Sequence, residues 1–276
     1  LAIDGEDLKP GDDPYRLLRG KADRPVTLTL APDANGTGSH QVSYRPITNE
    51  NDLGYLDMVL ANQKRVSDLS GGRVGYIHIP DMGADGLREF IKWYYPQIRK
   101  EGLVVDVRAN GGGNVSRMLI ERLRRELLGV NFARTDEQPA TYPDQVFVGP
   151  MAAILDEYSS SDGDIFPYMF RQAKLGPLIG KRSWGGVVGI NGGVPLMDGG
   201  NINVPTSALA SADGQWVIEG HGVDPDIEVE NDPASVLAGR DPQLERAVQE
   251  VMNQMATRRH TLPVRPADKV KPRSGQ

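Results

Sequence analysis

The sequence contains no cysteine, no long apolar run and no excess of positive charge. Without cysteine the chain can form neither a disulfide bond nor a catalytic thiolate, and this absence is typical of cytoplasmic proteins. No apolar segment approaches the length that crosses a bilayer. The net charge of −6 carries no general signature of nucleic-acid binding. We therefore expect a cytoplasmic protein with no membrane or nucleic-acid partner.

The composition is that of a globular protein, and clusters of turn residues divide the chain into four regions. With 39% hydrophobic and 25% charged residues, 276 residues can form one large or two small domains. Residues 1–33 predict a strand, a turn, a short helix and a second strand. Residues 34–45, which begin ANGTGSH, predict a linker, and residues 46–257 the main domain. Residues 258–276 carry six basic side chains against one acidic one, which predicts a solvated, flexible tail.

Apolar segments of two kinds alternate between residues 73 and 175. Three have the composition of buried strands, and a predicted helix follows each of them. The strands are predicted at 73–80, 102–108 and 151–155. The helices are predicted at 87–100, after the glycines of 111–113 with apolar Met118, Leu119, Leu123 and Leu127, and at about 162–174. Because strands that alternate with helices usually pair in parallel, this order predicts an α/β layer with a mostly parallel sheet.

A glycine-rich turn, Asn110 to Gly113, follows the second of these strands. Glycines can present backbone N–H groups to an oxyanion or a phosphate, because no Cβ stands in the way. The turn lacks the Gly-Lys-Ser/Thr ending of a P-loop and is not a complete GxGxxG motif. From the triplet alone, a tight strand-to-helix turn is the preferred interpretation.

A run of hydroxyl and carboxylate side chains, EYSSSDGD, follows the strand 151–155. It places Ser161 at the predicted start of a helix, where unpaired N–H groups and a partial positive charge would stabilise an oxyanion. The N–H of Asp162 would be one donor. The alternative, preferred from the local pattern alone, is that Ser160 or Ser161 is an N-cap, with Asp162 and Asp164 as acids of the first turn.

A nucleophilic serine needs a base within hydrogen-bond reach, and the chain offers four histidines. His40 lies in the predicted linker, His78 in a strand and His260 in the tail. His221 is the only histidine beside a second polar cluster, which includes Glu219, but this position by itself is a weak signal. No pair of histidines has metal-ligand spacing, so we expect no metal ion and no cofactor.

Six stretches, taken together and in order, resemble the tricorn-type serine peptidases within the tail-specific (C-terminal processing) peptidase family. The resemblance implies a crotonase-like α/β core with a mostly parallel sheet, preceded in residues 1–33 by part of a β-rich PDZ domain. It also implies that the chain is a fragment that starts inside that domain. The stretches are GRVGYIHIPDM (72–82), DVRANGGGNVS (106–116), EYSSSDGDIFP (157–167), GPLIGKRSWGGVVGI (176–190), MDGG (197–200) and GHGVDPDIEVE (220–230).

The family uses a nucleophilic serine, a histidine, a second serine and a glutamate. The resemblance implies that Ser161 is the nucleophile, that the amides of Gly113 and Asp162 form the oxyanion hole, and that Glu219 holds the second serine. The histidine and the second serine are expected upstream of Leu1. The isolated fragment is therefore expected to be inactive or nearly so.

The sequence departs from family patterns at two positions, and the resemblance also has implications for the substrate. The serine–lysine dyad of other tail-specific peptidases is not expected, because the lysine position falls on Gly186. Gly112 and Asn131 are expected to contact the substrate. Because Asn131 stands where tricorn-type enzymes tend to carry an acid, a preference for basic residues at P1 is not implied. The implied substrates are short or unfolded peptides, and the implied assembly is a homo-oligomeric ring.

Two other functions remain open from the sequence. The same fold occurs in non-catalytic peptide- or ligand-binding modules, although the presence of both Ser161 and Glu219 argues against that function. A crotonase-like acyl-CoA enzyme also uses glycine-turn amides as an oxyanion hole. That function would need a CoA-binding signature, which the sequence lacks.

Overall fold

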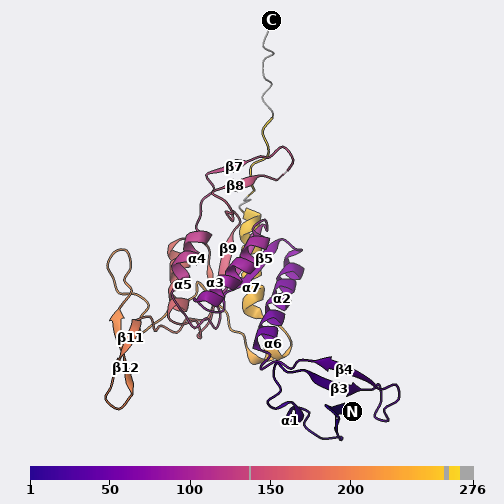
Figure 1. Cartoon of the computed structure of the whole chain (residues 1–276). Coiled ribbons are helices and arrows are strands. Elements are labelled where there is room, and N and C mark those ends of the chain that lie inside the picture. The colour runs from indigo at the N-terminus through magenta and orange to yellow at the C-terminus, as the bar shows by residue number, and fades with distance from the viewer. Residues whose placement is uncertain (137, 258–260, 268–276) are drawn as a thin grey trace, which may run out of the picture. The chain divides into compact units, whose positions relative to one another are not determined.

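The computed structural model describes residues 1–136, 138–257 and 261–267 (Figure 1). The described residues divide into two compact units, Leu1–Met58 and Val59–Gln276. The division falls within the long helix α2, Asn51–Ser70, and not between residues 45 and 46 as the sequence predicts. Each unit is described by itself below.

The first unit is a small antiparallel sheet in the strand order β2-β1-β3-β4. It buries Ile3, Leu17 and Val26 against one another. Its elements are β1 Ala2–Ile3, β2 Glu6–Asp7, α1 Tyr15–Leu18, β3 Val26–Leu30 and β4 His40–Tyr44. The β-rich character expected of this segment is confirmed.

The predicted linker over residues 34–45 is corrected by β4. This strand pairs with β3 along its whole length, from Val26 opposite Tyr44 to Leu30 opposite His40. The turn residues before it therefore form a hairpin loop, which has the same local composition as a linker. His40 belongs to this strand and not to a connecting segment.

The second unit is built on a parallel sheet. Within its described residues, five strands lie in the order β13-β10-β9-β6-β5, and every neighbouring pair is parallel. Every residue of β5, β6, β9 and β10 is buried. The strands are β5 Val74–His78, β6 Gly102–Asp106, β9 Met151–Leu155, β10 Leu178–Gly180 and β13 Ile227–Glu228. The prediction of an α/β layer with a mostly parallel sheet is confirmed.

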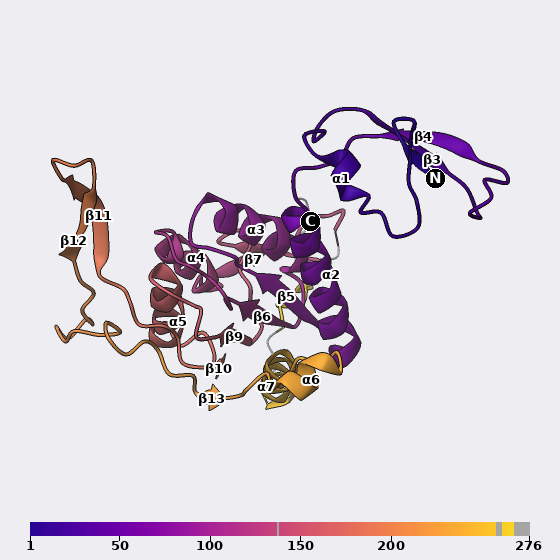
Figure 2. The ribbon, with the colours of Figure 1, turned by 90° about the horizontal axis from the view of Figure 1, so that it is seen from below.

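Helices cover both faces of this sheet (Figure 2). Helices α3, α4 and α5 lie on one side, where Phe90, Leu119, Phe166 and Phe170 join the main apolar core. Helix α7 packs against β9 and β6 on the other side. The helices are α3 Ala84–Tyr94 with a 3₁₀ turn at Tyr95–Gln97, α4 Ser116–Leu123, α5 Asp162–Gln172, α6 Pro233–Leu237 and α7 Pro242–Thr257.

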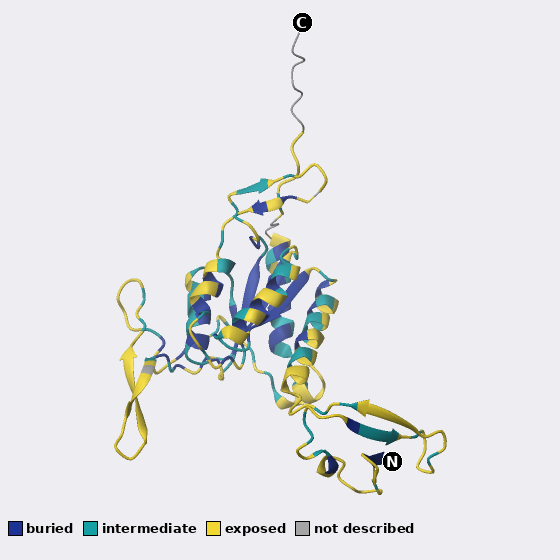
Figure 3. Cartoon of the chain, in the orientation of Figure 1, coloured by how far each residue is buried: buried dark blue, intermediate teal, exposed yellow. Residues whose placement is uncertain are grey.

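Two antiparallel hairpins extend from the core, and Figure 3 shows how little of them is buried. One consists of β7 Gly129–Asn131 and β8 Ala140–Tyr142. The other consists of β11 Gly189–Pro195 and β12 Asn201–Ser207, and β12 is exposed at every residue. Among the helices of the described residues, none has the length and apolar character to cross a membrane.

The predicted basic tail lies largely outside the described residues, which omit 258–260 and 268–276, and with them His260. The segment 261–267 has no helix or strand, and Arg265 donates to the carbonyl of Ala133 at 3.1 Å. Flexibility of the tail stays a prediction.

Candidate active site

The glycine turn and the serine turn meet at the carboxyl edge of the parallel sheet, and Asn110 joins them. Its carbonyl accepts a hydrogen bond from the N–H of Ser160 at 2.8 Å. Its side chain donates to the carbonyl of Ile79 at 2.8 Å and accepts from the N–H of Gly112 at 3.0 Å. Because Asn110 is completely buried, these bonds are shielded from water and hold the two turns together.

Gly112 and Gly113 occupy positions that no side chain could share. Gly112 has φ +94°, and an added Cβ would lie 2.6 Å from the Cβ of Ser161 and 3.0 Å from the nitrogen of Asp162. Gly113 has φ +148°, and an added Cβ would lie 2.0 Å from the carbonyl oxygen of Met82. Gly112 therefore permits the close approach of the serine turn, which the plain-turn interpretation does not explain, whereas Gly113 permits the close approach of the segment at Met82.

Ser161 stands at the amino end of α5 in a strained conformation. Its φ of 58° and ψ of −122° are unusual for a residue with a side chain. Within the described residues its side chain makes no capping hydrogen bond. Ser161 is thus the N-cap residue of α5, with Asp162 and Asp164 as acids of its first turn, as the alternative expects, but its half-buried hydroxyl does not cap the helix.

The amide groups of Gly113 and Asp162 lie on these two touching turns. In the part of the chain that the structure describes, neither N–H donates a hydrogen bond to a protein acceptor. The Asp162 amide belongs to the first turn of α5, where helix N–H groups lack intrahelical partners. Both groups can therefore bind an external acceptor such as an oxyanion.

The carboxylate of Asp162 has a structural contact of its own. It accepts hydrogen bonds from the N–H of Ser116 at 2.9 Å and from the Ser116 hydroxyl at 2.5 Å. Ser116 is the first residue of α4, so Asp162 caps that helix from the neighbouring one. The side chain thus ties α4 to α5 and leaves the backbone amide of Asp162 unused.

Glu219 is anchored beside the same region by one carboxylate oxygen. Its Oε2 accepts from the amides of Val187 at 2.7 Å and Val188 at 2.9 Å. Its Oε1 has no hydrogen bond among the described residues. The preceding residue, Ile218, is buried with φ 73°, a strained conformation for a β-branched residue. The exposed carboxylate of Glu219 therefore has one fixed oxygen and one available oxygen.

Two histidines of the described residues, His78 and His221, have polar partners of their own. The exposed His221 ring pairs with Asp224 at 2.7 Å, and its backbone carbonyl accepts from Arg182. The ring of His78 contacts the carbonyl of Arg108 at 3.3 Å inside the sheet. Within the described ranges, no group of histidine and acidic side chains could hold a metal ion.

The structure does not bring Asn131 to this edge of the sheet. Asn131 ends β7, and the loop that follows its hairpin accepts hydrogen bonds at Asp144 from Arg122 and Arg125, at the carboxyl end of α4. Because α4 begins at the cap that Asp162 supplies, its carboxyl end lies away from Ser161. Gly112, the other residue expected to contact substrate, is in contact with Ser161.

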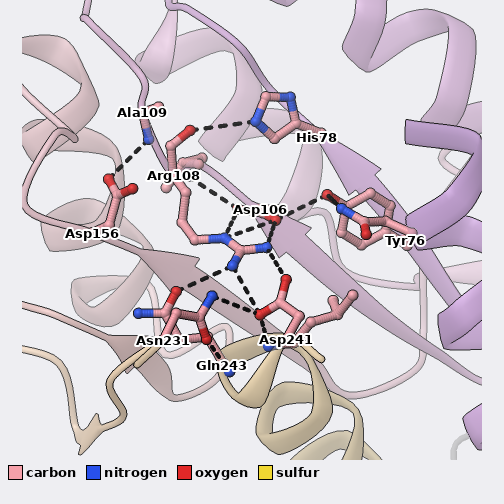
Figure 4. A network of polar contacts seen from close by, with 12 residues as sticks. Tyr76, His78, Asp106, Arg108, Ala109, Asp156, Asn231, Asp241 and Gln243 are labelled. Atoms are coloured by element: carbon pink, nitrogen blue, oxygen red, sulfur yellow. Dashed lines mark hydrogen bonds and ion pairs between the residues drawn. The ribbon is translucent and has the colours of Figure 1, made fainter. Parts of the chain in front are cut away.

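A buried polar network that the sequence reading missed supports the start of the glycine turn (Figure 4). The Arg108 guanidinium pairs with Asp106 at 2.6 Å and with Asp241 at 2.9 Å. Tyr76 donates to Asp106 at 2.9 Å. Burial raises the pKa of Asp106, but the charge and hydrogen bonds of Arg108 outweigh it and hold that pKa below its usual value. In the sequence, the signal for this network was the pair of oppositely charged residues Asp106 and Arg108, shortly before the glycines.

This network connects β6 to the amino end of α7. Asp241 also accepts from the N–H of Leu244, and so caps α7. On the other side of Arg108, the N–H of Ala109 donates to the carboxylate of Asp156 at 2.8 Å. The two residues directly before the glycine turn, Arg108 and Ala109, are therefore held by contacts from Asp106, Asp241 and Asp156.

Comparisons with known proteins identify the family of the chain. A family model described as peptidase family S41 matches residues 73–229, more than half of the chain. The chain belongs to peptidase family S41. As expected from the sequence, its S41 relatives include tricorn proteases, and its fold is the crotonase-like α/β fold of that family.

The S41 relatives that are most informative are much longer than this chain. It is 40% identical over 248 residues to tricorn protease homolog 1 of Streptomyces coelicolor, covering 90% of this chain and 23% of the relative. It is 38% identical over 265 residues to tricorn protease of Thermoplasma acidophilum, covering 96% and 24%. The chain thus spans about a quarter of the length of these relatives.

Two solved structures have a similar fold. A crystal structure of the tricorn protease superposes with a TM-score of 0.84 at 38% identity, covering 92% of this chain and 25% of that one. A putative peptidase from Parabacteroides merdae superposes with a TM-score of 0.53 at 17% identity, covering 89% and 85%. The second likeness shows the fold alone.

Proposed function

We propose that the full-length protein hydrolyses peptide bonds through an acyl-enzyme on Ser161. The observation that carries this proposal is the uncapped, strained Ser161 in contact with a glycine turn whose amide is unused. Ser161 Oγ attacks the peptide carbonyl, and the amides of Gly113 and Asp162 bind the oxyanion that forms. The amine leaves with a proton, and water then hydrolyses the acyl-enzyme.

The proton of Ser161 needs an acceptor. From the similarity to tricorn proteases, of which this chain spans about a quarter, we propose that the base is a histidine upstream of Leu1, oriented by a second serine. The available Oε1 of Glu219 would accept the hydrogen bond of that serine, while Oε2 stays fixed by the two valine amides. Glu219 would in this way hold the base in the correct orientation.

The substrate class follows from the similarity to tricorn proteases. We propose short or unfolded peptides as substrates and a homo-oligomer as the working form. Asn131 lies away from Ser161 within the chain, so it supports no P1 preference here. A cytoplasmic location stays a prediction from the absence of cysteine.

The decisive experiment compares two neighbouring serines in the full-length protein. Ser161→Ala is expected to abolish peptide hydrolysis and labelling by a serine-reactive phosphonate. Ser160→Ala is the matched control, since its side chain makes no hydrogen bond in the described structure, and it should retain both. Equal activity of the two variants would disprove the acyl-enzyme. Phosphonate labelling at Ser161 would also exclude the non-catalytic binding module.

A second experiment concerns the missing base. The isolated chain 1–276 is expected to show no peptide hydrolysis, because the proposed base histidine is not part of it. Hydrolysis that depends on Ser161 and is lost in His221→Ala would contradict this expectation and assign the base to His221.

A further inference from the structure

Asp164 is a buried carboxyl for which the proposed reaction has no role. It lies on the first turn of α5, three residues after Ser161, and its side chain is completely shielded from solvent. Its Oδ1 accepts a hydrogen bond from the N–H of Gly185 at 2.9 Å. Its Oδ2 is buried and has no hydrogen-bond partner among the described residues. A buried oxygen without a partner costs free energy of folding, so the position calls for an explanation.

Gly185, the partner of Asp164, also forms a hydrogen bond with the segment that carries Glu219. The carbonyl of Gly185 accepts from the N–H of Gly220 at 2.8 Å, next to Glu219. Two and three residues beyond Gly185, the amides of Val187 and Val188 hold the Glu219 carboxylate. A single peptide segment thus contacts Asp164 on one side and both Glu219 and its neighbour on the other.

Two further backbone hydrogen bonds hold the residues of this segment that come before Gly185. The N–H of Trp184 donates to the carbonyl of Ser159 at 2.9 Å, and the N–H of Ser183 donates to the carbonyl of Val223 at 3.1 Å. Both lie before Gly185. Val187 belongs to the same apolar core as α5, and among the hydrogen bonds between α5 and this segment, that of Asp164 with Gly185 lies nearest to the amides holding Glu219.

We propose that Asp164 is a positioning residue that sets the place of Glu219 relative to Ser161. Its carboxylate holds Gly185, Gly185 orders the two valine amides and Gly220, and these hold Glu219. The inference rests on the proposed function, because the position of Glu219 relative to Ser161 matters only if the two residues act together.

The hydrogen bond to Gly185 gives this buried carboxyl a role that an apolar side chain could not take. Burial raises the pKa of Asp164, although the amide of Gly185 opposes that effect. The folded protein therefore accommodates this carboxyl at a cost in stability. An apolar side chain could fill the same space without that cost, but it could not accept the hydrogen bond of Gly185.

A double-mutant cycle in the full-length protein tests the proposal. Asp164→Ala should lower kcat for a peptide substrate by about 10²-fold with little change in KM, the size of effect expected when a reacting group is misplaced. In a Glu219→Ala background, the same substitution should cost almost nothing further, since the residue it positions is already gone. Asp164→Asn keeps an acceptor oxygen for Gly185 and should restore most of the activity.

Phe170→Leu is the matched control for stability. Phe170 is fully buried on the same helix, away from the turn, so its substitution should lower stability while leaving kcat and the cycle unchanged. If Asp164→Ala lowered kcat by the same factor in the parent and in the Glu219→Ala background, the proposal would be overturned and Asp164 would be a structural residue. Full activity of Asp164→Ala would overturn it as well.

Hydrogen exchange separates a failure of this inference from a failure of the proposed function. If Ser161→Ala leaves hydrolysis intact, the proposed function is wrong, and activity no longer reports on Asp164. The amides of Gly185, Val187 and Val188 should still exchange faster in Asp164→Ala than in the parent or in Asp164→Asn. Unchanged protection of these amides in Asp164→Ala would refute the proposed link between Asp164 and the amides that hold Glu219.

Discussion

Gly112 and Ser161 are in such close contact that a Cβ on Gly112 would lie 2.6 Å from the Cβ of Ser161. The glycine turn and the start of α5 therefore determine each other's position. Residues far apart in the chain come into contact here because parallel strands end at the same edge of a sheet.

Gly112→Ala should abolish peptide hydrolysis in the full-length protein. The new methyl group would meet Ser161 and the Ser160 carbonyl, in a backbone conformation that alanine adopts with strain, so we also expect about 1–3 kcal/mol of destabilisation. Gly111→Ala is the matched control, because an added Cβ there meets nothing within 4 Å. Phosphonate labelling and activity of both variants provide the measurement. Similar activities would show that the contact is unimportant.

Asp162→Ala should weaken the start of α4 by about 0.5–2 kcal/mol, the usual cost of losing an N-cap. Ser116→Ala should cost less, because the bond from the Ser116 N–H to Asp162 remains. Native-state hydrogen exchange of the α4 amides in the full-length protein measures both effects. Phosphonate labelling of Ser161 should persist in Asp162→Ala, since the amide belongs to the backbone. Unchanged exchange in Asp162→Ala would exclude the cap.

Arg108→Met should destabilise the core around β6 and α7 by about 3–5 kcal/mol. The substitution leaves two buried carboxylates, Asp106 and Asp241, without their shared cation. Arg73→Met is the control, because Arg73 forms an exposed pair with Glu101 and should cost no more than about 1 kcal/mol. Hydrogen exchange of β6 amides compares the two. Equal costs would mean that the network is no more important than a surface ion pair.

Asp164 should make stability depend on pH in the direction opposite to that of a paired carboxylate. Burial raises its pKa above the ordinary value of 3.8 in the folded protein. Between the pKa of Asp164 in the unfolded chain and its higher pKa in the folded protein, the folded state binds more protons than the unfolded state. This contribution to stability therefore falls as pH rises. The stability of Asp164→Asn relative to the parent should therefore increase through that window. Hydrogen exchange of α5 amides against pH measures it, and a pH-independent difference would contradict the prediction.

The local pattern of residues was sufficient for the elements of the parallel sheet. Met151–Leu155 is a strand with the predicted bounds, because a short apolar run between polar turns has few other solutions. The same local information failed for residues 34–45, since the turn residues of a hairpin loop and of a linker are alike. For Ser161 and the glycine turn the local pattern favoured a helix cap and a plain turn, and only the resemblance to a family implied their roles as nucleophile and oxyanion hole.

The arrangement of the site depends on contacts between residues that are distant in the chain, which no local pattern encodes. Such contacts leave the Ser161 hydroxyl uncapped, anchor Glu219 on two valine amides and bury Asp164 against Gly185. They also place Asn131 away from Ser161. Backbone preferences act over a few neighbouring residues, so the sequence could specify the strands and turns, whereas the packing of the sheet and its helices brought particular side chains together.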